Sequence, residues 1–371
     1  PPLHEGQNMT ETELKNRLKT ITQPDEAARK AAHAHWASLA KPLGGLGDLE
    51  PLLEDVAALT GVPQFDFSKR AVLVLCADNG VIAQGISQSG SDVTRAVLQN
   101  LAQRKTSVCK MAETVHCGVI PVDMGIAGAP VDGVKNCRVR AGTDDFTGGP
   151  AMTREDALQA IETGIELVRE QKAQGIKLLA TGEMGIGNTT TSSAVLCALT
   201  GASVADVTGR GGGLTDAAFL KKKEVISHAL ALHKPDSNDP IDVLSKVGGF
   251  DLCAMTGVFL GAARQRLPVV VDGFISIVAA LCAGRLAPLS KGYFLGSHRS
   301  FEVGFRLAER ELGLKPCLDL GMRLGEGSGC PIAFRVVEAA CAVMDTMATF
   351  PEAAIDDTYL TEIRAKDSFT V

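Results

Sequence analysis

IKLLATGEMGIGNTTTSSAVL, residues 176–196, decides the fold class, because it has the pattern of a strand, a glycine loop and a helix in direct succession. Apolar runs of the same kind, each followed by a glycine-bearing loop and a helical pattern, occur at 71–80 (AVLVLCADNG), 115–125 (VHCGVIPVDMG), 267–274 (LPVVVDGF) and, more weakly, 292–298 (GYFLGSH). Nearly continuous apolar strands alternating with helices are typical of a parallel sheet covered on both faces. The sequence therefore predicts an α/β fold with a doubly wound, mainly parallel sheet flanked by helices.

The composition excludes several classes of protein. Of the 371 residues, 45% are hydrophobic and 22% are charged, which is typical of a globular chain and not of a disordered one. A formal net charge of -6 argues against nucleic acid as a partner. The longest apolar stretch, about residues 267–283, is interrupted by Asp272 and is shorter than the roughly 20 residues of a membrane span. We therefore expect no nucleic-acid partner and no membrane partner.

The ten cysteines indicate a reducing compartment. No two of them stand in C-x-x-C spacing, and most lie inside apolar runs, which is typical of buried thiols. Neither H-x-x-x-H nor H-E-x-x-H occurs, so a metal site is not expected. No secretory signal is visible, and the leading PPLHEGQN (1–8) before Met9 has the character of a remnant of recombinant expression. We expect a cytoplasmic protein.

The five apolar runs all end in polar or glycine-rich clusters. These clusters are DNG (78–80), DMG (123–125), GEMG (182–185), DG (272–273) and SH (297–298). Each cluster alone is explained by the needs of a turn. In a parallel sheet, however, all the carboxyl ends of the strands meet at one edge, where ligands bind. Together the clusters predict one shared pocket.

Two glycine loops predict an anion site in that pocket. After GEMGIG, Asn188 or Thr189 is expected to cap the next helix, and Gly185 and Gly187 let an anion approach its free amides. TGRGGGLTDAAFLKKK (208–223) places an arginine among glycines before a helix with three consecutive lysines. One of these lysines facing the glycine loop would be enough to bind the anion, while the others would form a solvated helix face. The absence of G-x-G-x-x-G after the first strand argues against a dinucleotide oxidoreductase.

Two further loops carry candidate acid–base groups. GMRLGEGSGC (321–330) places Glu326 between glycines, where partial burial would raise its pKa and make it a better base near neutral pH. The alternative is that Glu326 caps the helix expected near Pro331. SHRSFEVG (297–304) contains a Ser-His pair, but no G-x-S-x-G elbow accompanies it. Ser297 or Ser300 as the cap of a helix is the simpler interpretation.

Taken together, the motifs resemble one family. KPLGGLGDLE, ADNGV, GEMGIGNTT, GRGGG, KVGGFDLCAMTGVFLGAA, LPVVVDGF, SHRSFE and GMRLGEGSG occur in the order and spacing of nicotinate-nucleotide–dimethylbenzimidazole phosphoribosyltransferases. The resemblance extends from about Lys41 to Phe350. It implies transfer of the 5-phosphoribosyl group of nicotinate mononucleotide to a lower-ligand base, giving an α-riboside 5′-phosphate and nicotinate, in cobamide nucleotide loop assembly.

The resemblance also implies an architecture and a partner. We expect a large α/β (Rossmann-like) catalytic domain over residues 61–329. A small helical domain would be built from both chain ends, residues 9–60 and 330–371, which agrees with the helical pattern of residues 9–40. The family works as a dimer without a metal or cofactor.

Site residues follow from the matched motifs. Glu326 is expected to be the base that deprotonates the acceptor, and Glu183 the second acidic residue beside the ribosyl centre. The residues expected to hold the phosphate are Gly185, Gly187, Asn188, Thr189, Arg210, Gly211 and Lys222. Asp272, Ser300 and Glu302 are expected to line the same pocket.

Departures from the family pattern concern the acceptor. Asn79 stands where many relatives have His, Gln88 and Ser89 replace the pattern that relatives commonly show, and Val97 falls where the enteric enzymes have Gln. GRGGG also replaces the GRGTG of many relatives. A benzimidazole, a purine and a phenol therefore remain open as acceptors. Phenol-activating relatives use a paralogous partner, so a heterodimer is an alternative to a homodimer, as is a non-catalytic subunit that completes a partner's site.

Overall fold

The structure, a computed structural model, describes residues 9–365. The expected expression remnant, residues 1–8, lies outside the described residues, as do residues 366–371 at the end of the expected small domain.

A seven-stranded sheet forms the centre of the molecule, and every strand pair in it is parallel. The strand order is β3-β2-β1-β4-β5-β6-β7. The strands are β1 (Arg70–Ala77), β2 (Gly118–Gly125), β3 (Lys135–Asn136), β4 (Leu178–Met184), β5 (Val269–Val271), β6 (Phe294–His298) and β7 (Pro316–Leu318). The predicted parallel α/β fold is therefore confirmed, with β3 and β7 as additional edge strands.

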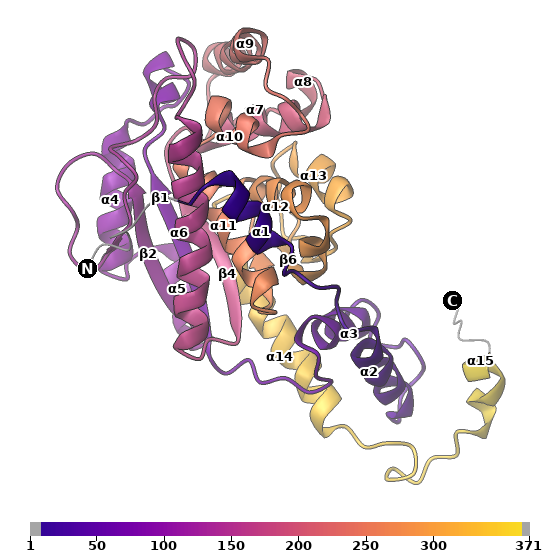
Figure 1. The fold of residues 1–371 in the computed structure, drawn as a ribbon. Helices are drawn as coiled ribbons and strands as arrows, with labels where there is room; N and C mark the ends of the chain where they lie inside the picture. The colour runs from indigo at the N-terminus through magenta and orange to yellow at the C-terminus, as the bar shows by residue number, and fades with distance from the viewer. Residues whose placement is uncertain (1–8, 366–371) are drawn as a thin grey trace.

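Helices make up most of the remaining described chain (Figure 1). The α-helices are α1 (Glu11–Leu18), α2 (Glu26–Ser38), α3 (Leu49–Thr60), α4 (Ser91–Ala102), α5 (Ser107–Glu113), α6 (Arg154–Ala173), α7 (Asn188–Thr200), α8 (Val204–Val207), α9 (Asp216–His233), α10 (Pro240–Val247), α11 (Phe250–Arg264), α12 (Phe274–Leu286), α13 (Phe305–Leu312), α14 (Cys330–Thr346) and α15 (Thr361–Ala365). Short 3₁₀ helices are η1 (Gly80–Gln84), η2 (Pro288–Tyr293) and η3 (Thr358–Leu360).

The order in which the chain adds strands to the sheet changes side at β1. From β1 the chain moves to β2 and β3 on one side, and then returns to β4, β5, β6 and β7 on the other. Because parallel crossovers are right-handed, this change of side puts α4 and α5 on one face of the sheet and α6, α11 and α12 on the other. All eight residues of β1 are buried as a result. The switch point between β1 and β4 is where an open sheet of this kind binds ligands.

The helices α6 and α11 cross almost in backbone contact. A Cβ atom on Gly257 would lie 1.9 Å from the Ile161 carbonyl oxygen, and one on Gly164 would lie 2.0 Å from the Ala254 carbonyl oxygen. Only glycine permits this approach. The close crossing helps to bury α11 from Phe250 to Ala263.

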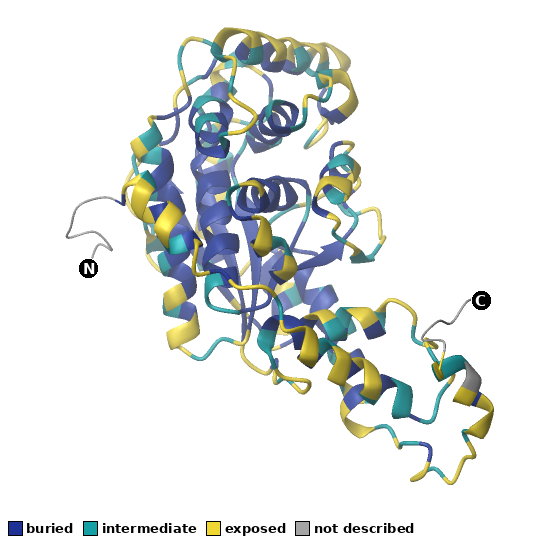
Figure 2. Ribbon diagram, turned by 45° about the vertical axis from the view of Figure 1, so that its right-hand side comes forward, coloured by how far each residue is buried: buried dark blue, intermediate teal, exposed yellow. Residues whose placement is uncertain are grey.

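Segments near the two ends of the described chain, α2 and α3 from one and α15 from the other, come together in a helical lobe that projects from the sheet (Figures 1 and 2). There α2 packs on α3, and the amide of Ala40 donates to the carbonyl oxygen of Ala348 at 2.9 Å. The first helix lies elsewhere, because the Met9 amide donates to the Glu162 carboxylate of α6 at 3.1 Å. The proposed small domain would thus draw on α2, α3, α15 and part of α14, while α1 joins the large body.

Among the helices of residues 9–365, none is long and apolar enough to cross a membrane. All ten cysteines, which lie within the same described range, carry free thiols.

Candidate active site

A cavity of about 320 Å³ opens at the carboxyl edge of the sheet. The ends of β4, β5 and β6 line it, together with the loops around residues 86–89, 209–214 and 323–326. The predicted shared pocket is thus formed from three of the five strand ends.

The other two strand ends serve as loop anchors, which corrects the expectation that all five line the pocket. After β1, the Asp78 carboxylate accepts the Ala127 amide at 2.8 Å. In β2, the Asp123 carboxylate accepts the Arg138 guanidinium at 2.7 Å and the Ile126 amide at 2.9 Å. Both carboxylates are therefore engaged in holding the segment that follows β2.

Glu326 lies in the loop between β7 and α14 and lines the cavity. Its φ of 61° is left-handed, as are those of its neighbours Gly325 (88°) and Gly327 (85°). Its Oε2 atom is buried and has no hydrogen-bond partner among the described residues. Burial raises the pKa of Glu326, and the backbone amide of Val108 opposes the rise. The alternative role as a helix cap is wrong, because α14 begins at Cys330 with Gly329 as its N-cap.

Glu183 is the last residue but one of β4; it lines the same cavity and is 8% exposed. Burial, followed by the charge of Asp251, raises the pKa of Glu183 to about 8. The loop that carries Glu326 packs against the Glu183 side chain, since a Cβ atom added to Gly325 would lie 2.4 Å from Glu183 Oε1. The two predicted carboxylates therefore face one space.

Asn188 binds carboxylates instead of capping a helix. The N-cap of α7 is Gly187, at φ 94°, and it makes no side-chain cap. The Asn188 amide nitrogen donates both to Glu183 and to Asp251, the latter at 3.1 Å. With both amide hydrogens engaged, Asn188 has none left to donate to a phosphate.

Sequence reasoning missed Asp251. It is fully buried at the start of α11, and burial raises its pKa to about 6. Its position after Gly248-Gly249-Phe250 looks like an ordinary acidic first turn of a helix, so the sequence offered no signal that it reaches Asn188.

The structure selects Lys222 from the three consecutive lysines. It is 1% exposed, whereas Lys221 is exposed. Its ammonium group donates to Thr189 Oγ1 at 2.8 Å and to the Gly209 carbonyl oxygen at 3.0 Å. Burial lowers the pKa of Lys222 to about 8, and Glu302 opposes this effect. One buried cation thus joins the two glycine loops.

Arg210 lines the cavity, but its guanidinium group is engaged within its own segment. It donates to the Leu214 carbonyl oxygen at 2.9 Å and to Asp216 at 2.6 Å, and it lies over the Phe219 ring. This arrangement does not fit the expected clamp on a phosphate. Gly211, in contrast, comes close to Thr189: its added Cβ would lie 2.8 Å from Oγ1.

Ser300 and Glu302 line the cavity from the loop after β6. The expectation that Ser297 or Ser300 caps a helix is wrong, because Ser297 is inside β6 and α13 begins at Phe305 after Gly304. Ser300 Oγ accepts the Glu302 amide at 3.3 Å instead. The Glu302 carboxylate reaches the glycine loop, where a Cβ on Gly209 would lie 2.0 Å from its Oε2.

Residues expected on the acceptor side divide into two groups. Gln88, Ser89 and Val97 line the cavity, and the Gln88 amide donates to the Gly213 carbonyl oxygen. Asn79 does not line it: this side chain is 1% exposed and lies beneath Gly185, whose added Cβ would be 2.9 Å from Asn79 Nδ2. A direct contact of Asn79 with an acceptor is therefore not supported.

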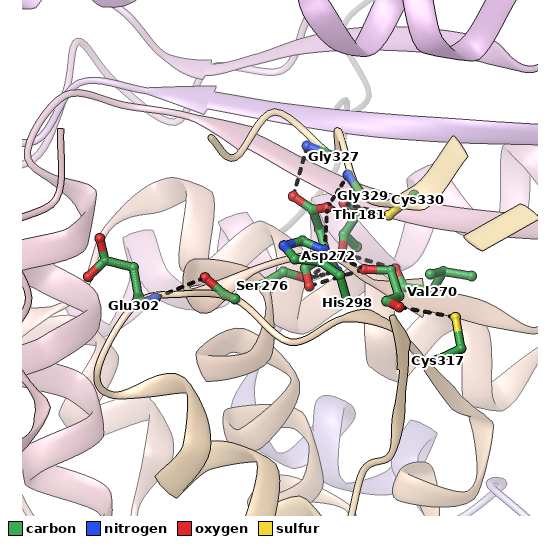
Figure 3. A network of polar contacts seen from close by, with 12 residues as sticks. Thr181, Val270, Asp272, Ser276, His298, Glu302, Cys317, Gly327, Gly329 and Cys330 are labelled. Atoms are coloured by element: carbon green, nitrogen blue, oxygen red, sulfur yellow. Dashed lines mark hydrogen bonds and ion pairs between the residues drawn. The ribbon is translucent and has the colours of Figure 1, made fainter. Parts of the chain in front are cut away.

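Asp272, at the end of β5, is 2% exposed and lies beside His298, with 3.8 Å between Oδ1 and Nδ1 (Figure 3). Burial raises the pKa of Asp272 to about 7. Within residues 9–365, no group of three or more His, Cys, Asp or Glu side chains is arranged to hold a metal ion. The arrangement can place a proton acceptor and a buried cation around one small organic phosphate.

Comparisons with known proteins agree on one family. The family described as "Phosphoribosyltransferase" matches residues 21–355. A nicotinate-nucleotide–dimethylbenzimidazole phosphoribosyltransferase of Clostridium perfringens is 48% identical over 355 residues, covering 95% of this chain and 98% of that protein. Its namesake from Roseiflexus sp. is 46% identical over 344 residues, covering 92% and 98%. A crystal structure of CobT from Thermus thermophilus superposes with a TM-score of 0.85 at 36% identity, covering 89% of this chain and 99% of that one.

Proposed function

The chain belongs to the nicotinate-nucleotide–dimethylbenzimidazole phosphoribosyltransferase family, and on this premise we propose that it transfers 5-phosphoribosyl from nicotinate mononucleotide to a lower-ligand base. The products would be an α-riboside 5′-phosphate and nicotinate, for the nucleotide loop of a cobamide. The observation that carries the proposal is the placement of Glu326, Glu183 and Lys222 around one cavity.

The phosphate of nicotinate mononucleotide would bind beside Lys222 and Thr189. The Lys222 ammonium already donates to the Thr189 hydroxyl. It also lies close to Gly211, since a Cβ atom added to that glycine would be 3.6 Å from Lys222 Nζ. A buried ammonium group attracts a phosphate strongly because little solvent screens it. This binding would place the ribose toward the two carboxylates.

Glu183 would stabilise the ribosyl centre. When the bond between C1 and the cationic nitrogen breaks, its electron pair goes to that nitrogen and the pyridine ring of nicotinate becomes neutral, so the departure of nicotinate needs no general acid. The anomeric carbon then resembles an oxocarbenium ion, which a neighbouring carboxylate stabilises. With its pKa raised to about 8, Glu183 is mostly protonated at pH 7 in the free protein. The pyridinium cation of the bound substrate favours the ionised form.

Glu326 would act as the base. The acceptor's ring nitrogen forms the new bond to C1, while the proton on the acceptor's other ring nitrogen moves to the Glu326 carboxylate. Oε2 of Glu326 is free to take it, since it accepts no hydrogen bond from the described part of the chain. Its raised pKa brings the carboxylate closer to the range in which a base works well near neutral pH.

The proposal is tested by nicotinate release. The purified chain is mixed with nicotinate mononucleotide and, separately, dimethylbenzimidazole, adenine or phenol, and nicotinate is followed by chromatography. Acceptor-dependent release is expected for the chain alone, working as a homodimer. Binding of nicotinate mononucleotide without release with any acceptor would contradict the proposal and favour a subunit that completes a partner's site. We also propose a cytoplasmic location, which the ten free thiols support.

The affinity for nicotinate mononucleotide should fall above pH 8. The pKa of Lys222 in the free protein is lowered to about 8, so its positive charge is lost as the pH rises through that value. A bound phosphate stabilises the charged form and shifts the loss to higher pH in the complex. The pH profile of kcat/KM for nicotinate mononucleotide should therefore decline above pH 8, while kcat persists to higher pH. A flat kcat/KM between pH 7 and 9.5 would contradict the role of Lys222.

Changes at Gln88 or Ser89 should alter acceptor choice more than nucleotide affinity. Both residues line the cavity on the loop before α4, and Gln88 also holds Gly213. Gln88→Met or Ser89→Tyr should change the ratio of kcat/KM values between dimethylbenzimidazole, adenine and phenol by about 10-fold, the size of modest pocket changes. Competition assays with paired acceptors measure this ratio. Equal effects on all acceptors and on nicotinate mononucleotide would place these residues elsewhere.

A further inference from the structure

We propose that Asp272 is a positioning residue that holds the loop of residues 325–329, and through it Glu326, in the conformation needed for proton transfer. The inference rests on the proposed function for its catalytic meaning. Asp272 lines the cavity, as expected, and the proposal gives its carboxylate a role in holding this loop.

The Asp272 carboxylate bonds the backbone directly after Glu326. Its Oδ2 atom accepts the Gly327 amide at 3.1 Å, and its Oδ1 atom accepts the Gly329 amide at 2.9 Å. The Cys330 thiol also lies 3.7 Å from Oδ1. In Figure 3 both glycines lie over the carboxylate. A group that accepts from two amides of one turn fixes the position of that turn and its rotation.

The loop needs such a hold because its backbone is unfavourable on its own. Residues 325, 326 and 327 all have positive φ, and for Glu326 this is a conformation that side-chain-bearing residues rarely adopt. Strain of this kind persists only where surrounding contacts fix it. The Glu326 carbonyl also rests on β4, since a Cβ on Gly182 would lie 2.3 Å from that oxygen.

Asp272 is itself held firmly at the end of β5. Its amide donates to Ser276 Oγ at 3.1 Å, and its carbonyl oxygen accepts from Ser297 Oγ at 3.2 Å. Ser276, on α12, is paired in turn with Thr181 Oγ1 of strand β4 at 2.6 Å (Figure 3). The chain of contacts thus connects the rigid sheet with the loop that carries the base.

The decisive substitution is Asp272→Asn, which keeps the size of the side chain but replaces one of its two hydrogen-bond acceptors by a donor. Both carboxylate oxygens accept backbone N–H groups, so the NH₂ of asparagine must face one of these donors. We expect kcat to fall about 100-fold, as a displacement of about 1 Å can cause. The KM values for nicotinate mononucleotide and acceptor should stay within about threefold, because Asp272 is proposed to touch neither.

A double-substitution cycle separates positioning from a role of its own. In a Glu326→Gln background the same Asp272→Asn change should cost no further activity, because the base it positions is already gone. Tyr293→Phe is the control: it removes one hydrogen bond of a buried side chain, to the Thr22 carbonyl oxygen at 3.0 Å, outside the network of Asp272, and should keep kcat. Additive losses in the cycle, or a raised KM with unchanged kcat, would overturn the proposal.

Hydrogen exchange tests the same claim on the unaltered protein, should Asp272→Asn fail to fold. The amides of Gly327 and Gly329 should exchange much more slowly than in an unstructured peptide, by residue-resolved measurement. Exchange of both at the unstructured rate would overturn the proposal. This measurement needs no turnover, so it decides about the loop even if the nicotinate-release assay contradicts the proposed function.

Discussion

Replacing Glu326 by glutamine is expected to lower kcat by about 10²–10⁴-fold, the usual contribution of a positioned general base. Glutamine keeps the size of the side chain and the backbone requirement at φ 61°, but its amide cannot accept the acceptor's proton. The KM for nicotinate mononucleotide should change little, because its phosphate binds at the Lys222 side of the cavity. Steady-state kinetics with dimethylbenzimidazole and chromatographic detection of nicotinate measure both values.

A surface substitution provides the control for that experiment. Glu224→Gln makes the same chemical change at an exposed position of α9 and should leave kcat unchanged. Thermal unfolding of both variants should resemble that of the unaltered protein. Wild-type turnover by Glu326→Gln would remove this residue from the role of base.

Replacing Lys222 by methionine is expected to raise the KM for nicotinate mononucleotide by about 10–100-fold, the value of a hydrogen bond to a charged group. The ammonium group is buried, and it is the cation that donates to Thr189 at 2.8 Å. Methionine fills nearly the same space without the charge. The effect should disappear with nicotinate riboside, which lacks the phosphate, so paired kinetics with the two substrates isolate the contact.

Lys221→Met is the matched control on the same helix. Lys221 is exposed, so its loss should leave the KM for nicotinate mononucleotide within about twofold, as for most surface substitutions. An equal rise for the mononucleotide and the riboside in Lys222→Met would show that Lys222 supports the fold and does not bind phosphate.

The fold was predictable where strands are buried on both faces. The central strand β1 is buried along its whole length, and its run of apolar residues is visible in the sequence. The edge strands β3 and β7 were missed because they have only 2 and 3 residues and are at most half-buried. A strand of that length is defined by its neighbour in the sheet and leaves no pattern in its own sequence.

The candidate site was predictable in its residue types and less so in its contacts. Three residues that the sequence placed in the pocket do line the cavity: Glu183 near the end of a strand, and Glu326 and Lys222 in or beside the glycine-loop motifs. The helix caps expected of Asn188 and Ser300 were wrong: Ser300 accepts the Glu302 amide within its own loop, and Asn188 donates to Glu183 and to the distant Asp251. Asp251, which is 63 residues from Asn188 in the chain, shows the same limit.

The glycine crossing of α6 and α11 extends the sensitive region far beyond the cavity. Gly257 is six residues after Asp251 on the same helix, or roughly 9 Å along its axis at 1.5 Å per residue. A single methyl group at that crossing would push α6 and α11 apart and displace Asp251, the residue of α11 to which the Asn188 side chain donates. Inactivating mutations can therefore arise far from the bound reactants. At this crossing the space between the two helix backbones decides which side chains are tolerated.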